Sequence, residues 1–174
     1  EIVKAVKKAI EDEIKALERL KKAKFALTPE GIAMSKSFNK NKGRLIWPVE
    51  RGEITSKYGR HQHHLVSTAF VDNNGVDITT SKNANVRAVF EGKVTSVLII
   101  PGAGKVVMVS HGEYRTVYAN LQEVYVKKGD QVKAKDKLGK LLAKESGISE
   151  SHFEIWRILT SGMSTVNPSF WLSK

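Results

Sequence analysis

The spacing of apolar residues changes near Leu45, and this change limits the chain to an α-helical part followed by a β part. Before it, apolar side chains recur at steps of three and four residues, as in an amphipathic helix; they are Val3, Val6, Ile10, Ile14, Leu17 and Leu20. After it, the strand-like segments are 94–100, 106–109 and 114–118. The sequence therefore predicts a mainly antiparallel β domain behind an N-terminal helical arm.

These signals divide the chain into three parts. Residues 1–27 form the amphipathic helix, which cannot bury its apolar stripe alone and needs either another coiled-coil strand or the domain itself. Thr28 and Pro29 suit the start of a second, short helix, so 28–44 reads as that helix and a basic linker. Residues 45–174 form the β domain.

Composition restricts the classes of partner. Cysteine is absent, so neither a disulfide framework nor a thiol nucleophile is possible. The net charge of +11 favours polyanions in general, yet the basic residues are scattered and no nucleic-acid-binding motif occurs. We therefore expect a solvated basic surface and no nucleic-acid partner. Because residue 1 is Glu, we also expect a piece of a longer protein, with any export signal outside it.

Residues 45–174, about three-quarters of the chain, resemble the LytM domain of lysostaphin-like zinc endopeptidases that cut peptidoglycan. Seven landmarks occur in the family's order, at 46–49, 54–59, 73–77, 86–94, 110–121, 150–154 and 167–172. By resemblance, 46–49 is the first strand, 86–94 is a hairpin, and the fold is an antiparallel sandwich or barrel. Residues 73–77 read Asn-x-Gly-x-Asp where the family has His-x-Gly-x-Asp, and 150–154 have Glu150 where the family has the first of two histidines.

The resemblance also assigns roles in a zinc site, which needs three ligands, an open position and a proton-transfer group. Position 73 is the first ligand, but Asn73 is a neutral amide. Asp77 and His152 are the second and third ligands and are intact, while the two catalytic histidines are replaced by Asn120 and Glu150. The sequence thus predicts no catalytic residue and no bound zinc, with Asp77 and His152 as remnant ligands that hydrogen-bond to each other.

The nearest subset by resemblance is the EnvC-type murein hydrolase activators, because 41–49 looks like their linker. It implies a periplasmic or cell-envelope protein of cell division that activates an N-acetylmuramoyl-L-alanine amidase and is connected upstream to an FtsE–FtsX-type complex. The degenerate groove would bind the amidase. The net positive charge of the chain is also compatible with contact to peptidoglycan. The predicted groove residues are Asn73, Asp77, Asn120, Glu150, His152, Tyr58 and Tyr118. Phe70 and Trp156 are further aromatic candidates that could equally belong to the core.

Two alternatives remain open at this point. The first is a zinc endopeptidase in which a substitute ligand replaces Asn73; the candidates are Asp72, Glu150 and the loop histidines His61, His63 and His64. Exposed loop histidines are the favoured interpretation of the last three, and His111 is interpreted as a turn residue. The second alternative is a module that binds peptidoglycan alone. The helix 1–27 could in addition fold back over the groove and mask it.

Overall fold

The computed structural model describes residues 2–21, 28–63 and 65–174. The helices are α1 (Ile2–Lys21), α2 (Pro29–Lys40) and the 3₁₀ turn η1 (Pro168–Phe170). The strands are β1 (Glu53–Ser56), β2 (Gly59–Gln62), β3 (Phe70–Asn73), β4 (Val76–Ser81), β5 (Asn85–Arg87), β6 (Gly92–Ile100), β7 (Gly104–His111), β8 (Tyr114–Val124), β9 (Gln131–Val132), β10 (Lys137–Leu141), β11 (Ile148–Leu159) and β12 (Gly162–Val166). The predicted helical residues 22–27, the side chains of Leu17 and Leu20, and His64 lie outside what is described.

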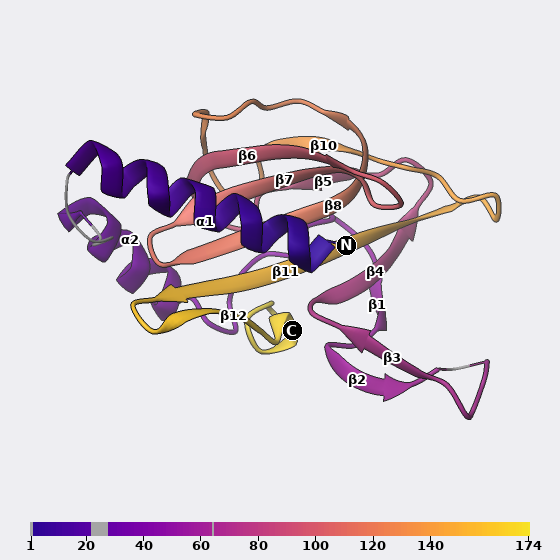
Figure 1. Cartoon of the computed structure of the whole chain (residues 1–174). Helices are drawn as coiled ribbons and strands as arrows, with labels where there is room; N and C mark the ends of the chain where they lie inside the picture. The colour runs from indigo at the N-terminus through magenta and orange to yellow at the C-terminus, as the bar shows by residue number, and fades with distance from the viewer. Residues whose placement is uncertain (1, 22–27, 64) are drawn as a thin grey trace.

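One large antiparallel sheet dominates the domain, in the order β1-β4-β11-β8-β7-β6-β9 (Figure 1). β12 pairs with the outer part of β11, and β10 pairs with both β5 and β8. β2 and β3 form a separate two-stranded hairpin that projects from the body of the domain. The predicted fold class, a mainly antiparallel β domain preceded by a helix, is confirmed.

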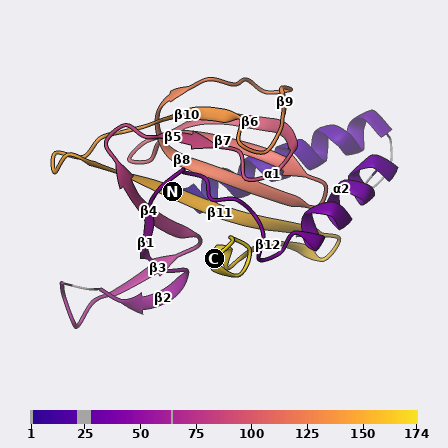
Figure 2. The same ribbon diagram turned by 180° about the vertical axis from the view of Figure 1, so that it is seen from behind.

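The central strands bury both of their faces, because alternate side chains enter two different cores. The first core includes Val107, Tyr118 and Phe153 and lies on the side of β5 and β10. The second core includes Met108, Val117 and Trp156 and is covered by α1. Seen from behind, α1 lies on the far side of the sheet (Figure 2).

The partner of the amphipathic helix is therefore the domain itself. Val6 and Ile10 are fully buried in the second core, and Val3 and Ile14 pack against its edge. The guanidinium of Arg115 on β8 donates to Glu13 on α1, with Nη2–Oε1 at 2.6 Å and Nε–Oε2 at 3.3 Å. Neither helix in the described part of the chain is long and apolar enough to span a bilayer.

The second helix, α2, is fixed by its cap and by one aromatic side chain. Thr28 Oγ1 accepts from the backbone N–H of Gly31, which confirms the predicted N-cap. Phe38 is fully buried and stacks on His111 with ring centroids 4.7 Å apart. The β7–β8 turn approaches α2 so closely that a Cβ on Gly112, whose φ is +78°, would lie 2.2 Å from Ser35 Oγ.

Two details of the predicted strands are wrong. Residues 46–49 form no strand, because Pro48 has no N–H and the carbonyls of Trp47 and Pro48 instead accept from Arg87. Residues 86–94 form no hairpin, since β5 pairs with β10 while β6 pairs with β7 and β9.

Candidate functional site

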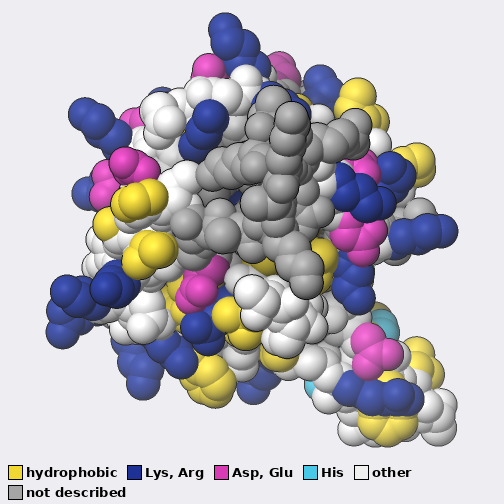
Figure 3. Space-filling view, turned by 60° about the vertical axis from the view of Figure 1, so that its left-hand side comes forward, with side chains coloured by type: hydrophobic (Ala, Val, Ile, Leu, Met, Phe, Trp, Pro, Cys, Tyr) yellow, Lys and Arg dark blue, Asp and Glu magenta, His cyan; other side chains and the backbone are white. Residues whose placement is uncertain are grey.

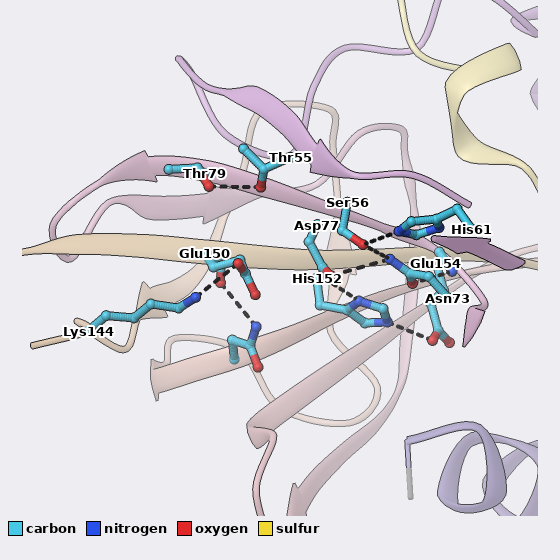
Figure 4. Close-up of polar contacts among 12 residues, drawn as sticks. Thr55, Ser56, His61, Asn73, Asp77, Thr79, Lys144, Glu150, His152 and Glu154 are labelled. Carbon is cyan, nitrogen blue, oxygen red and sulfur yellow. Dashed lines mark hydrogen bonds and ion pairs between the residues drawn. The ribbon is translucent and has the colours of Figure 1, made fainter. Parts of the chain in front are cut away.

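The site begins with a cross-strand pair on β4 and β11. Asp77 and His152 face each other directly in the register of these antiparallel strands. Their side chains meet with His152 Nδ1 2.7 Å from Asp77 Oδ1 (Figure 4). The hydrogen bond predicted between the two remnant ligands is therefore confirmed.

Glu154 occupies the other side of the imidazole. Because it lies two residues along β11, its side chain is on the same sheet face as His152, and its Oε2 is 2.7 Å from His152 Nε2. Glu154 Oε1 accepts from the indole N–H of Trp156 at 2.8 Å. Glu154 is not among the predicted site residues, although its two-residue spacing from His152 is the sequence signal that places both side chains on one face.

These contacts determine the charge of His152. Burial lowers the pKa of the imidazole, but the hydrogen bonds and negative charges of Asp77 and Glu154 outweigh it and raise the pKa to about 9. At neutral pH the ring is therefore an imidazolium that donates both N–H groups to carboxylates. An imidazole binds a metal through a nitrogen that carries no proton, so neither nitrogen of His152 is available in this arrangement.

Asn73 closes the site from the end of β3. Its amide Nδ2 donates to Ser56 Oγ at 3.1 Å and to Asp77 Oδ2 at 3.2 Å, and its Oδ1 accepts from the backbone N–H of Gly75. Gly75 is packed so closely that a Cβ there would lie 2.1 Å from the carbonyl oxygen of Phe153. Asn73 thus shapes the β3–β4 turn and presents N–H groups, not a lone pair, to Asp77.

Asn120 and Glu150 form a separate polar group on the neighbouring part of β8 and β11. Asn120 has a left-handed φ of 64°, and its Nδ2 donates to the backbone carbonyl of Glu150 at 3.1 Å. The carboxylate of Glu150 is 3.0 Å from Lys144 Nζ (Figure 4). Both residues at the positions of the family's catalytic histidines are therefore engaged in structural contacts.

The candidate substitute ligands do not complete a metal site. His61 Nε2 lies 3.5 Å from Ser56 Oγ, so Ser56 stands between this ring and Asn73 (Figure 4). His63 Nδ1 accepts from the backbone N–H groups of Leu65 and Val66 within its own loop. In the described ranges, no group of three or more His, Asp or Glu side chains is placed to hold a metal ion. The residues present do not fit the zinc ion that the LytM resemblance implies.

Two of the four aromatic side chains predicted to contact a ligand belong to the interior. Tyr118 is fully buried and its hydroxyl accepts from the backbone N–H of Val89, so its place in the groove is a wrong prediction. Trp156 is buried beneath α1, which agrees with the alternative that this side chain belongs to the core. Tyr58 is half-buried and bonds to Thr165, whereas Phe70 is 60% exposed beside Arg60. His111, interpreted from sequence as a turn residue, ends β7 with its side chain fully buried.

A cavity of about 420 Å³ lies over the site, between the domain and α1. His152, Glu154 and Asn73 form one side of it. The β6–β7 turn at 101–103 and the first turn of α1, through Ile2 and Val3, form the others. The N-terminal helix therefore covers the sheet face that carries His152 and extends to the site.

Comparisons with known proteins agree with this geometry. The profile of Peptidase family M23 matches residues 71–168. The chain is 32% identical over 111 residues to the peptidoglycan DD-endopeptidase ShyB of Vibrio cholerae, covering 62% of this chain and 25% of that protein. It is 31% identical over 118 residues to the cell division protein DipM of Caulobacter vibrioides, covering 66% of this chain and 18% of that protein. This chain thus spans a quarter or less of either relative.

The solved structure of a third protein has the same fold. A chain of the SpoIIQ–SpoIIIAH pore-forming complex superposes with a TM-score of 0.58 and 25% identity. The match covers 76% of this chain and 93% of that one. Relatives with this domain thus include one named as a hydrolase and one named as part of an assembly.

Proposed function

The chain belongs to peptidase family M23, the family of the LytM domain, and we propose that it is a non-catalytic member that activates a peptidoglycan amidase. One observation carries the proposal: His152 donates both ring N–H groups to carboxylates while Asn73 presents its amide N–H to Asp77. A hydrolytic zinc site needs unprotonated ligands and an open position for water. This arrangement supplies no unprotonated imidazole nitrogen and has an amide N–H at the position of the first ligand.

The missing proton-transfer groups support the same proposal. General acid–base catalysis needs a group that can reach the reacting atoms and that titrates near the working pH. Asn120 cannot titrate, and the Glu150 carboxylate is held by Lys144. In the described structure, the two positions that hold the proton-transfer histidines of the LytM family therefore provide no free proton-transfer group.

The partner is an N-acetylmuramoyl-L-alanine amidase, bound over the face that α1 covers. The cavity there has a polar floor at His152, Glu154 and Asn73 and an apolar wall at Ile2 and Val3, which suits a peptide segment. We propose that α1 masks this face and that the amidase binds after α1 moves away. An upstream FtsE–FtsX-type complex is the proposed source of that movement.

The cell envelope, with the periplasm as compartment, is the proposed location. One relative is named as a peptidoglycan endopeptidase and the other as a cell division protein, and together these names support a location at the cell wall. Peptidoglycan is therefore a possible additional ligand. No zinc or other cofactor takes part in the proposed activity.

The test is dye release from labelled peptidoglycan by the full chain with added zinc, first alone and then with a candidate amidase. We expect no release by the chain alone and faster release when it is added to the amidase. The Ile10→Asp variant, which places a charge in the second core, should stimulate the amidase more strongly. Release by the chain alone that is lost in His152→Ala would instead establish a zinc endopeptidase with substitute ligands. Tight binding to purified peptidoglycan without any effect on amidases would establish a binding module.

A further inference from the structure

A second cavity, of about 340 Å³, lies away from the M23 site and is strongly basic. It is bounded by the segment before β1, the end of β4, the strand β5 and the turn into β10. Four cationic side chains line it, namely Arg51, Arg87, Lys135 and Lys137, together with a single carboxylate, Glu50. On the face that Figure 3 shows, Lys and Arg side chains lie at many separate places.

Two of these cations directly oppose each other. Arg87 on β5 and Lys137 on β10 are cross-strand partners in the antiparallel ladder. Side chains at such positions lie about 5 Å apart at Cβ, and like charges there destabilise a sheet. Arg87 is held in place because its Nε donates to the carbonyl of Trp47 at 3.0 Å.

The other two cations are also positioned by their backbone. Lys135 has a left-handed φ of 75°, and its N–H donates to the carbonyl of Ala88 at 2.9 Å. The carbonyl of Arg51 accepts from Thr80 Oγ1 at 2.6 Å. The backbone of these four residues is thus anchored to the fold around one hollow.

Among the described residues, none of the four cations takes part in an ion pair. The neighbouring Asp136 directs its carboxylate to the backbone N–H of Lys133. Glu50 is exposed, and it is the one carboxylate in a cavity lining that contains four cationic side chains.

We propose that this cavity binds a phosphate group. Arginine and lysine offer only donors, and they form short, charge-assisted hydrogen bonds to phosphate oxygens. A phosphate dianion presents more charge and more acceptor oxygens than one carboxylate, so it matches a four-cation site better. The group could belong to free phosphate or to the headgroup of an anionic lipid, and the experiment separates these sources.

The test compares two double variants of equal charge in the full chain. Lys135→Gln/Lys137→Gln removes two cations from the cavity, and Lys127→Gln/Lys128→Gln removes two exposed lysines outside it. Inorganic phosphate is titrated into each protein by calorimetry and by amide NMR. Vesicles of phosphatidylglycerol in phosphatidylcholine are tested by sedimentation in phosphate-free buffer.

We expect saturable binding to one of the two probes, weakened about tenfold or more in the cavity variant and unchanged in the matched control, since two charge-assisted bonds are lost. Binding to phosphate would identify a soluble ligand, and binding to vesicles alone would identify a lipid headgroup. Equal weakening in both variants, or no binding to either probe, would overturn the proposal.

A second measurement, of melting temperature, tests whether the opposed charges of Arg87 and Lys137 repel each other. In phosphate-free buffer of low ionic strength, Lys137→Gln should melt at a higher temperature than Lys127→Gln, because it removes the repulsion from Arg87. If Lys137→Gln melts no higher than the control, the two charges do not repel and the cavity needs no anion.

Discussion

Arg115 of β8 and Glu13 of α1 form a two-point ion pair that connects the N-terminal helix to the M23 domain. The side chain of Arg115 is 3% exposed and that of Glu13 is 20% exposed, so the pair lies under the helix. The ion pair adds to the apolar contacts that Val6 and Ile10 make with the second core. α1 is therefore docked by a specific polar contact as well as by its apolar stripe.

The first prediction concerns this ion pair. Glu13→Gln leaves the buried guanidinium of Arg115 without its charge partner, and we expect a loss of about 1–3 kcal/mol in unfolding free energy. The measurement is urea unfolding. Asp12→Asn is the matched control, because Asp12 forms an exposed pair with Lys8 and should change stability by about 0.5 kcal/mol or less. Equal losses in the two variants would show that Glu13 does not dock the helix.

The second prediction concerns release of α1. Ile10→Asp places a carboxylate in the second core and should undock the helix, exposing Trp156 and red-shifting its fluorescence. Apparent affinity for an amidase should rise by roughly tenfold for each 1.4 kcal/mol of docking free energy removed, because more molecules are competent to bind. Lys7→Asp, at an exposed position of the same helix, is the control. Undocking without increased affinity would contradict masking while leaving the activator proposal intact.

The third prediction is a pH dependence that comes from His111. Burial lowers the pKa of its imidazole to about 3, while the unfolded chain has an ordinary value near 6.5. Below pH 6.5 the unfolded state binds a proton that the native state does not. Stability should therefore fall by about 1.4 kcal/mol per pH unit between pH 6.5 and 3.

His111→Gln isolates this contribution from the other titrating groups. Glutamine lacks a titrating group but can replace some hydrogen bonds to Glu91 and Thr116. The difference in unfolding free energy between wild type and variant should shrink as the pH is lowered from 7.5 to 5. Parallel pH curves for the two proteins would mean that His111 is not a buried neutral imidazole.

How far the sequence predicts the site depends on the range of the interaction. The Asp77–His152 contact is predictable because the resemblance to the LytM domain assigns both residues to one zinc site and so places them side by side. The orientation of Tyr118 is not, because alternation identifies two faces without saying which one lines the groove. Asn120, two residues after Tyr118, has a left-handed φ within β8, and no local pattern indicates that irregularity.

The docking of α1 illustrates the same limit. Its apolar stripe predicts that Val6 and Ile10 are buried, but a stripe does not identify its partner surface. The partner includes residues of β6, β7, β8 and β11, and the first of these strands begins at Gly92, 71 residues beyond the end of the helix at Lys21. The 102-residue separation of Glu13 and Arg115 likewise leaves no local signal of their pairing.

The last prediction is that one substitution restores a zinc site. Asn73→His adds an imidazole beside Asp77 and His152, and together these supply the three protein ligands of a hydrolytic zinc site. We expect this variant to retain about one zinc ion per chain after dialysis. Wild type and the Asn74→His control should retain none. Binding should weaken at lower pH, because zinc must displace a proton from His152.

Zinc alone should not bring hydrolysis, because Asn120 and Glu150 remain. We expect release of dye from labelled peptidoglycan only when Asn73→His is combined with Asn120→His and Glu150→His, which returns both proton-transfer groups. The decisive comparison is zinc content against activity across this series. Stoichiometric zinc in the wild-type chain, lost in His152→Ala, would mean that Asp77 and Glu154 give up the imidazole to a metal, and the non-catalytic assignment would be wrong.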